Sequence, residues 1–97
     1  MSEVFKALAD PTRQLILDEL CERDGQTLFE ICSRLAMRHG IGMSRQAISQ
    51  HLALLEAADL VRSRKEGRCK IHEFNPEPIA GSVARWLRPK DKETNPR

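Results

Sequence analysis

Long apolar segments are absent from the sequence. Nowhere do about 18 apolar residues follow one another, which is the length that a membrane-spanning helix needs. The first residues contain an early acid, Glu3, and no apolar run of signal-peptide length. We therefore expect a protein that neither spans a membrane nor is secreted.

Cysteine is also sparse. The sequence has 3 cysteines, Cys21, Cys32 and Cys69, an odd number at wide and unpatterned spacings. This arrangement indicates neither a disulfide framework nor a Cys-x-x-Cys metal site. We expect a protein of the reducing cytoplasm that has no metal site and no cofactor.

Sequence motifs of enzymes are missing as well. There is no glycine-rich phosphate loop, no nucleophile elbow and no pair of metal ligands. A chain of 97 residues is one domain with a thin core and leaves little room for a substrate pocket. These absences predict that the protein is not an enzyme.

Charge is present in both signs but is unevenly distributed. Residues 1–30 carry three basic and seven acidic side chains, whereas residues 31–74 carry eight basic and four acidic ones. The basic surplus lies in one part of a chain whose net charge is only +2. A local basic surface is what binding to a polyanion requires, because phosphate contacts supply most non-specific affinity.

The stretch 44–58 has the pattern of a helix that binds DNA. Ile48, Leu52 and Leu55 have the spacing of one buried stripe. The other faces hold side chains that can bond base edges or phosphates, namely Ser44, Arg45, Gln46, Ser49 and Gln50. Any surface helix also has polar residues opposite its core stripe, so the neighbouring segments must decide between the two interpretations.

Two helices are predicted before residue 23. Residues 2–9 place Val4, Phe5 and Leu8 on one face of a short helix. Asp10 then provides an N-cap and Pro11 suits the first helical position, so a second helix is expected to run to about residue 22.

A third helix leads into the stretch 44–58. Thr27 and Glu30 form a capping-box pattern, which predicts a helix over 28–38. Gly40 and Gly42 end this helix and Ser44 caps the next one. This pattern predicts a helix-turn-helix, in which a short turn with glycine joins two helices and the second helix carries the base-reading residues.

A basic hairpin is predicted after this unit. The runs 60–65 and 69–74 read as strands, with Gly67 in the turn between them. Arg64, Lys65 and Arg68 lie near the tip and suit the DNA backbone or minor groove, where arginine is favoured. The alternative is that these cations only protect an exposed strand edge from aggregation.

A last helix is predicted from the Asn75-Pro76 start to about Arg88. Its apolar stripe contains Ile79, Val83, Trp86 and Leu87. This stripe either covers the core or pairs, together with the first helix, with the same helices of a second subunit. We expect the domain to span 1–88 and residues 89–97 to be a disordered polar tail.

Three strings of the sequence resemble the ArsR-type winged helix-turn-helix transcriptional regulators. They are FKALADPTRQLILDEL at 5–20, SRQAISQHLALLEAADLV at 44–61 and RKEGRCKIHEF at 64–74. The resemblance implies a mainly α fold of about five helices with a small β-hairpin wing. It also implies a homodimer built on the first and last helices, which binds a roughly palindromic operator and represses transcription until a signal releases the DNA.

The sequence departs from this family at the positions that sense metals. Metal-sensing members have a pair of cysteines on the third helix, and only Cys32 is present here. Members of another type place Asp and His ligands on the last helix, but 79–88 contains neither. A single thiol lacks the donors of a tight soft-metal site. Cys32 is either a thiol sensor or apolar filler.

We therefore predict a sequence-specific, homodimeric repressor of transcription that binds double-stranded DNA. Bases would be read by Arg45, Gln46, Ser49 and Gln50, and phosphates would be bound by Ser44, by His51 and by the hairpin residues Arg64, Lys65 and Arg68. The dimer interface would contain Val4, Phe5, Leu8, Ile79, Val83, Trp86 and Leu87. The alternatives are a winged helix that binds an acidic protein and a thiol-responsive repressor that uses Cys32.

Overall fold

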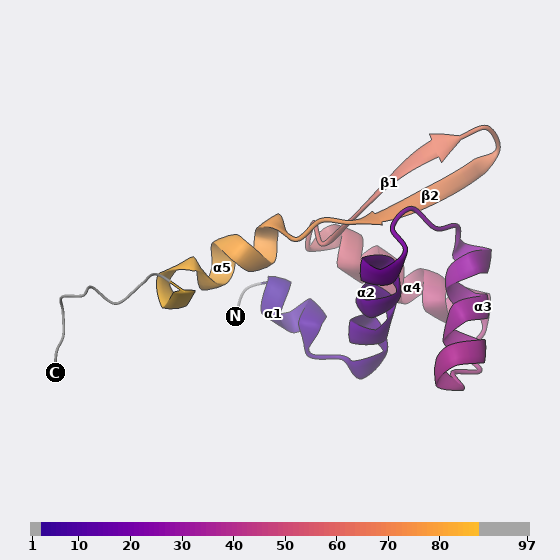
Figure 1. Ribbon diagram of the computed structural model, residues 1–97, viewed down its shortest axis with the longest axis horizontal. Helices are drawn as coiled ribbons and strands as arrows, with labels where there is room; N and C mark the ends of the chain where they lie inside the picture. The colour runs from indigo at the N-terminus through magenta and orange to yellow at the C-terminus, as the bar shows by residue number, and fades with distance from the viewer. Residues whose placement is uncertain (1–2, 88–97) are drawn as a thin grey trace, which may run out of the picture.

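The computed structural model describes residues 3–87, which form five helices and one two-stranded antiparallel hairpin (Figure 1). In chain order the elements are α1 (Glu3–Leu8), α2 (Pro11–Glu22), α3 (Leu28–His39), α4 (Arg45–Ala57), β1 (Val61–Glu66), β2 (Cys69–Phe74) and α5 (Glu77–Leu87). This architecture confirms the predicted fold class. The expected ends of the first and last helices at Ser2 and Arg88, and the tail 89–97, lie outside the described residues.

Helices α2, α3 and α4 begin where the sequence predicts, because their caps are local, whereas α5 begins one residue after the predicted Pro76. The Asp10 carboxylate accepts a hydrogen bond from the backbone N–H of Arg13 (3.0 Å). Thr27 and Glu30 form the reciprocal capping box at the start of α3. The Ser44 hydroxyl accepts from the N–H of Ala47 (3.1 Å) and thereby starts α4. Each cap satisfies a donor that the first helical turn leaves without a partner.

The core lies between α2, α3, α4 and the base of the hairpin. Its fully enclosed side chains are Ile16, Leu20, Ile31, Leu35, Ile48, Leu55 and Leu60. The stripe predicted for α4 is confirmed, since Ile48, Leu52 and Leu55 are all buried. The opposite surface of α4 is consequently left facing outward.

The hairpin is closed by a two-residue turn and anchored at its base. Glu66 pairs with Cys69, which leaves Gly67 and Arg68 in the turn, and Gly67 has a φ of 64° that disfavours any side chain. At the other end of the hairpin, the backbones of Gln26 and His72 exchange two hydrogen bonds (3.0 and 2.8 Å). The segment before α3 therefore holds β2 in place, while the tip extends away from the helices (Figure 1).

The first and last helices lie together at one end of the molecule (Figure 1). The Phe5 and Trp86 rings contact each other, with 6.3 Å between their centroids. None of the described residues of α5 is buried. Among residues 3–87, no helix is long and apolar enough to cross a membrane.

Candidate nucleic-acid interface

The outer surface of α4 brings the predicted base-reading side chains together. Arg45, Gln46, Ser49 and Gln50 are all exposed. These four border one shallow hollow of about 470 Å³, which also touches Leu28 and Ala53. The hollow is an open surface on which several donors and acceptors converge, as reading of base edges in a major groove requires.

The tip of the hairpin is strongly basic, but its cations differ in their partners. Arg64 is bound within the hairpin by Glu66 (3.0 Å) and Glu73 (3.3 Å). These carboxylates raise the pKa of Arg64 above its ordinary value, first through their hydrogen bonds and then through their charges. By contrast, Lys65 and Arg68 are exposed and have no ion pair with any described residue. Lys65 and Arg68 are therefore the better candidates for phosphate contacts.

Lys70 belongs to the same surface, although the sequence did not single it out. It pairs directly with Lys65 across the two strands, so two like charges lie side by side on one face of the hairpin. Its only described counter-charge is Glu56, at 3.9 Å. A phosphate would relieve this repulsion. Lys70 could be identified from the strand register, because a turn that begins at Gly67 pairs Lys65 with Lys70.

A second hollow connects α4 to the hairpin. It has a volume of about 280 Å³ and lies between the start of α3, the side of α4 and β2. Ser49 borders both hollows, and Lys70 and Thr27 border this second one. The predicted base-reading residues on α4 and Lys70 of β2 therefore border one continuous surface.

One ring nitrogen of His51 has partners within the chain. Its ring is half-buried against the start of α2, where Nδ1 lies 3.2 Å from Nη1 of Arg13 and 3.8 Å from the carboxylate of Asp10. Sequence reasoning missed this contact because Arg13 and His51 are 38 residues apart. Nδ1 is thus occupied within the chain.

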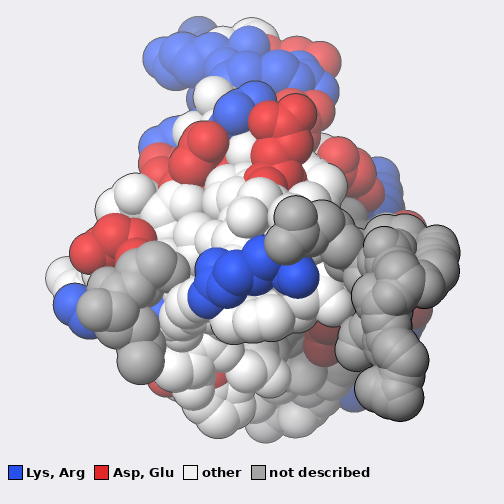
Figure 2. All heavy atoms as spheres, turned by 90° about the vertical axis from the view of Figure 1, so that its left-hand side faces the viewer, with Lys and Arg blue, Asp and Glu red and all other residues white. Residues whose placement is uncertain are grey.

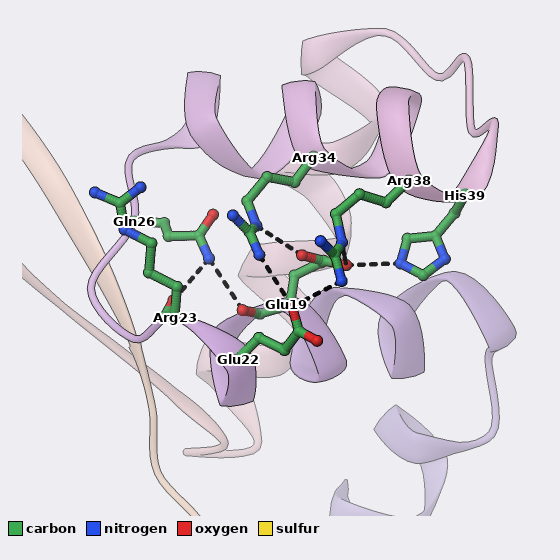
Figure 3. A network of polar contacts seen from close by, with 7 residues as sticks. All are labelled: Glu19, Glu22, Arg23, Gln26, Arg34, Arg38 and His39. Carbon is green, nitrogen blue, oxygen red and sulfur yellow. Dashed lines mark hydrogen bonds and ion pairs between the residues drawn. The ribbon is translucent and has the colours of Figure 1, made fainter.

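A buried carboxylate holds the end of α3, just before the turn that leads to α4 (Figure 3). Glu19 is 2% exposed and accepts hydrogen bonds from Arg34 Nε (2.6 Å), Arg38 Nε (3.1 Å) and His39 Nε2 (2.7 Å). Burial alone would raise the pKa of Glu19, but the hydrogen bonds from His39 and Arg34 and the two guanidinium charges outweigh burial and lower it. The cluster fixes α3 against α2 and so positions the turn before α4.

Cys32 does not have the surroundings of a reactive thiol. It is half-buried beside the core, and burial raises its pKa more than the nearby charge of Arg45 lowers it. A higher pKa leaves less thiolate, the nucleophilic form, at neutral pH. Within the described part of the chain, no three His, Cys, Asp or Glu side chains are grouped as metal ligands.

Comparison with known proteins agrees with this geometry. A family model described as a helix-turn-helix domain matches residues 8–64. An ArsR-like transcriptional regulator from Rhodococcus sp. RHA1 superimposes with a TM-score of 0.65 at 41% sequence identity, over 88% of this chain and 73% of that one. The chain belongs to the ArsR family of winged helix-turn-helix regulators.

Two bacterial relatives are similar over nearly the whole length of this regulator. The HTH-type transcriptional regulator YuzN of Bacillus subtilis is 45% identical over 84 residues, which are 87% of this chain and 91% of YuzN. The transcriptional repressor SdpR of the same organism is 31% identical over 87 residues, which are 90% of this chain and 88% of SdpR. The protein is a DNA-binding transcriptional regulator and not an enzyme.

Proposed function

We propose that this regulator is a homodimeric repressor that reads a roughly palindromic operator with α4 in the major groove and the hairpin tip on the flanking backbone. The observation that supports the reading role is the exposed row on α4, in which Arg45, Gln46, Ser49 and Gln50 border one hollow. Arginine and glutamine can each make paired hydrogen bonds to a base edge. Lys70 borders the hollow that adjoins that row, and Lys65 and Arg68 carry further positive charge toward the tip of the hairpin.

The apolar end of the molecule supports the dimer. Figure 2 views this end, and uncharged side chains cover most of its described surface below the cations of the hairpin. Trp86 is 61% and Leu87 71% exposed, whereas Phe5, Leu8, Ile79 and Val83 are half-buried. Val4 is only 8% exposed, so it supports α1 from within the chain and adds little area to an interface. Covering exposed apolar area of this kind with a second copy would stabilise the dimer.

The similarity to SdpR, whose name describes a transcriptional repressor, supports repression as the direction of control. A two-fold symmetric dimer presents two copies of α4 to successive major grooves on one side of the duplex. The two half-sites should then lie roughly 34 Å apart, about one turn of DNA.

Selection of bound sites from random duplex DNA, with the purified protein at physiological salt, tests this function. We expect an enriched sequence with two inverted half-sites about one helical turn apart. A single unrepeated half-site would contradict the dimeric reading. Binding without any sequence preference, together with stoichiometric binding to an acidic protein, would replace the operator-binding role with the protein-interaction role.

A further inference from the structure

The Arg13 guanidinium joins three parts of the regulator. Its Nε donates to the backbone carbonyl of Ala7 (2.7 Å) and its Nη2 donates to that of Lys6 (3.2 Å). These two carbonyls are in the last turn of α1, whose carbonyls lack the usual donor four residues on, and that of Lys6 also accepts from the N–H of Ala9 (3.2 Å). The third nitrogen, Nη1, lies 3.2 Å from Nδ1 of His51 on α4. Every nitrogen of this half-buried side chain therefore has a different acceptor.

The contact with Arg13 determines which nitrogen of His51 carries the proton. A guanidinium has only donors, so Nδ1 must act as the acceptor and the proton of the neutral ring must be on Nε2. The opposite tautomer would set an Nδ1–H against the donors of Arg13. It would have to turn to the Asp10 carboxylate, which is 3.8 Å away and beyond hydrogen-bond distance.

We propose that Arg13 is a positioning residue for DNA binding, which holds His51 as a donor at Nε2 and fixes α4 against the end of α1. A donor at Nε2 is what a phosphate oxygen needs. The proposal rests on the proposed function, since it assigns His51 to the phosphate contacts of α4. Arg13 also connects α1, which belongs to the proposed dimer interface, to α4, which would read DNA.

The tautomer of His51 is measured on the protein alone, from the nitrogen chemical shifts of its imidazole ring at neutral pH. In the wild type we expect a pyridine-type Nδ1 and a protonated Nε2. In Arg13→Met, which keeps the unbranched stem but has no donors, we expect a mixture of the two tautomers. A protonated Nδ1 in the wild type, or an unchanged tautomer in Arg13→Met, would overturn the proposal.

A thermodynamic cycle on the affinity for the selected DNA site tests the functional link. We expect Arg13→Met and His51→Ala each to weaken binding about tenfold, and the double variant to be no weaker than His51→Ala alone. Arg13→Lys retains the charge but can serve fewer acceptors, so it should also weaken binding and shift the tautomer, and it replaces Arg13→Met if that variant does not fold. Additive effects would overturn the proposal.

Arg23→Met is the matched control. It removes the same charge from an exposed side chain whose one ion pair among residues 3–87 is with Glu30, at 3.7 Å, so we expect wild-type affinity. An equal loss of affinity in Arg23→Met would show a general charge effect and would overturn the positioning role. If the wild type selects no DNA site, the proposed function fails, whereas the tautomer of the free protein still decides what Arg13 does to His51.

Discussion

Single arginines on the two parts of the interface should affect DNA binding in different ways. Arg45 is exposed at the first position of α4, and Arg68 is exposed in the turn of the hairpin. A side chain that bonds a base edge contributes to the choice of sequence, whereas one that bonds a phosphate contributes to affinity for any sequence. The two substitutions can therefore be told apart by what they change.

We predict that Arg45→Ala costs about 1 to 3 kcal/mol of binding free energy and relaxes base choice at one position. Arg68→Ala should weaken binding to all sequences and reduce the slope of log affinity against log salt by about one. Gel-shift titrations with matched and mismatched sites at several salt concentrations measure both effects. Unchanged specificity in Arg45→Ala would contradict its role as a base reader.

The buried charge of Glu19 stabilises the same interface indirectly, because it fixes the end of α3 before the turn to α4. Glu19→Gln removes the buried carboxylate that Arg34 and Arg38 share, and we expect it to lower the free energy of unfolding by about 1.5 to 3 kcal/mol. Glu22→Gln is the control, because Glu22 contacts the same arginines but is half exposed. Glu22→Gln should lower the free energy of unfolding by less than about 1 kcal/mol. Urea denaturation at a fixed protein concentration gives both values.

The effect of Glu19 should also depend on pH. Its pKa in the folded protein lies below the ordinary value of 4.5, so the folded state binds fewer protons than the unfolded state in that range. The contribution of Glu19 to the free energy of unfolding is therefore fully present above pH 4.5. It is lost as the pH falls through the lower pKa of the folded state. The stability difference between wild type and Glu19→Gln should shrink in this acidic window, and a constant difference would contradict the ion-pair explanation.

Side-chain roles that depend on one element were predictable, and those that depend on distant partners were not. The outward row on α4 follows from the helical period alone, given the buried stripe. The contact between His51 and Arg13, and the cluster around Glu19, join different helices, and no local pattern identifies such partners. Lys70 was missed for the same reason, because its position beside Lys65 depends on the register of two strands.

The sequence locates the turn between α3 and α4, but only the structure shows which of its glycines caps α3. The sequence predicts that Gly40 and Gly42 end α3, but the two glycines have different backbones. Gly40 is the C-cap of α3 in the left-handed conformation, with a φ of 67°, whereas Gly42 has no such φ. A Cβ added at either position would meet no described atom within 4 Å. The two sites therefore differ in backbone conformation and not in the space for a side chain.

We predict that Gly40→Ala destabilises the regulator by about 1 to 2 kcal/mol, because an L side chain strains the left-handed conformation. Gly42→Ala should stabilise it by about 0.4 to 1 kcal/mol, because alanine restricts the unfolded chain. Thermal unfolding of both variants at equal concentration checks the pair. Equal effects would contradict the assignment of the cap to Gly40.

The proposed dimer depends on the whole chain, since α1 and α5 come from its two ends. The apolar stripe of α5 was predictable from its period, but its use was not, because the partner that would cover it is not encoded in local sequence. A Trp at the centre of a buried interface commonly contributes about 2 kcal/mol or more to binding. Trp86 is the most prominent candidate of this kind.

We predict that Trp86→Ala raises the dimer dissociation constant about 30-fold, which corresponds to about 2 kcal/mol. Met37→Ala is the control, because Met37 is 84% exposed on α3, at the opposite end of the molecule (Figure 1). Sedimentation velocity over a range of concentrations measures both. A monomeric wild type, or an equal shift in Met37→Ala, would contradict the interface.

The lack of any buried residue in α5 has a consequence for gene control. A helix whose apolar side chains are covered only in part within one chain contributes little to the stability of that lone chain. In the proposed dimer, the number of operator-competent molecules then rises with the square of the chain concentration when the protein is scarce. The regulator would respond to its own abundance with a threshold, so that small changes in its synthesis switch a promoter more sharply than a monomeric binder does.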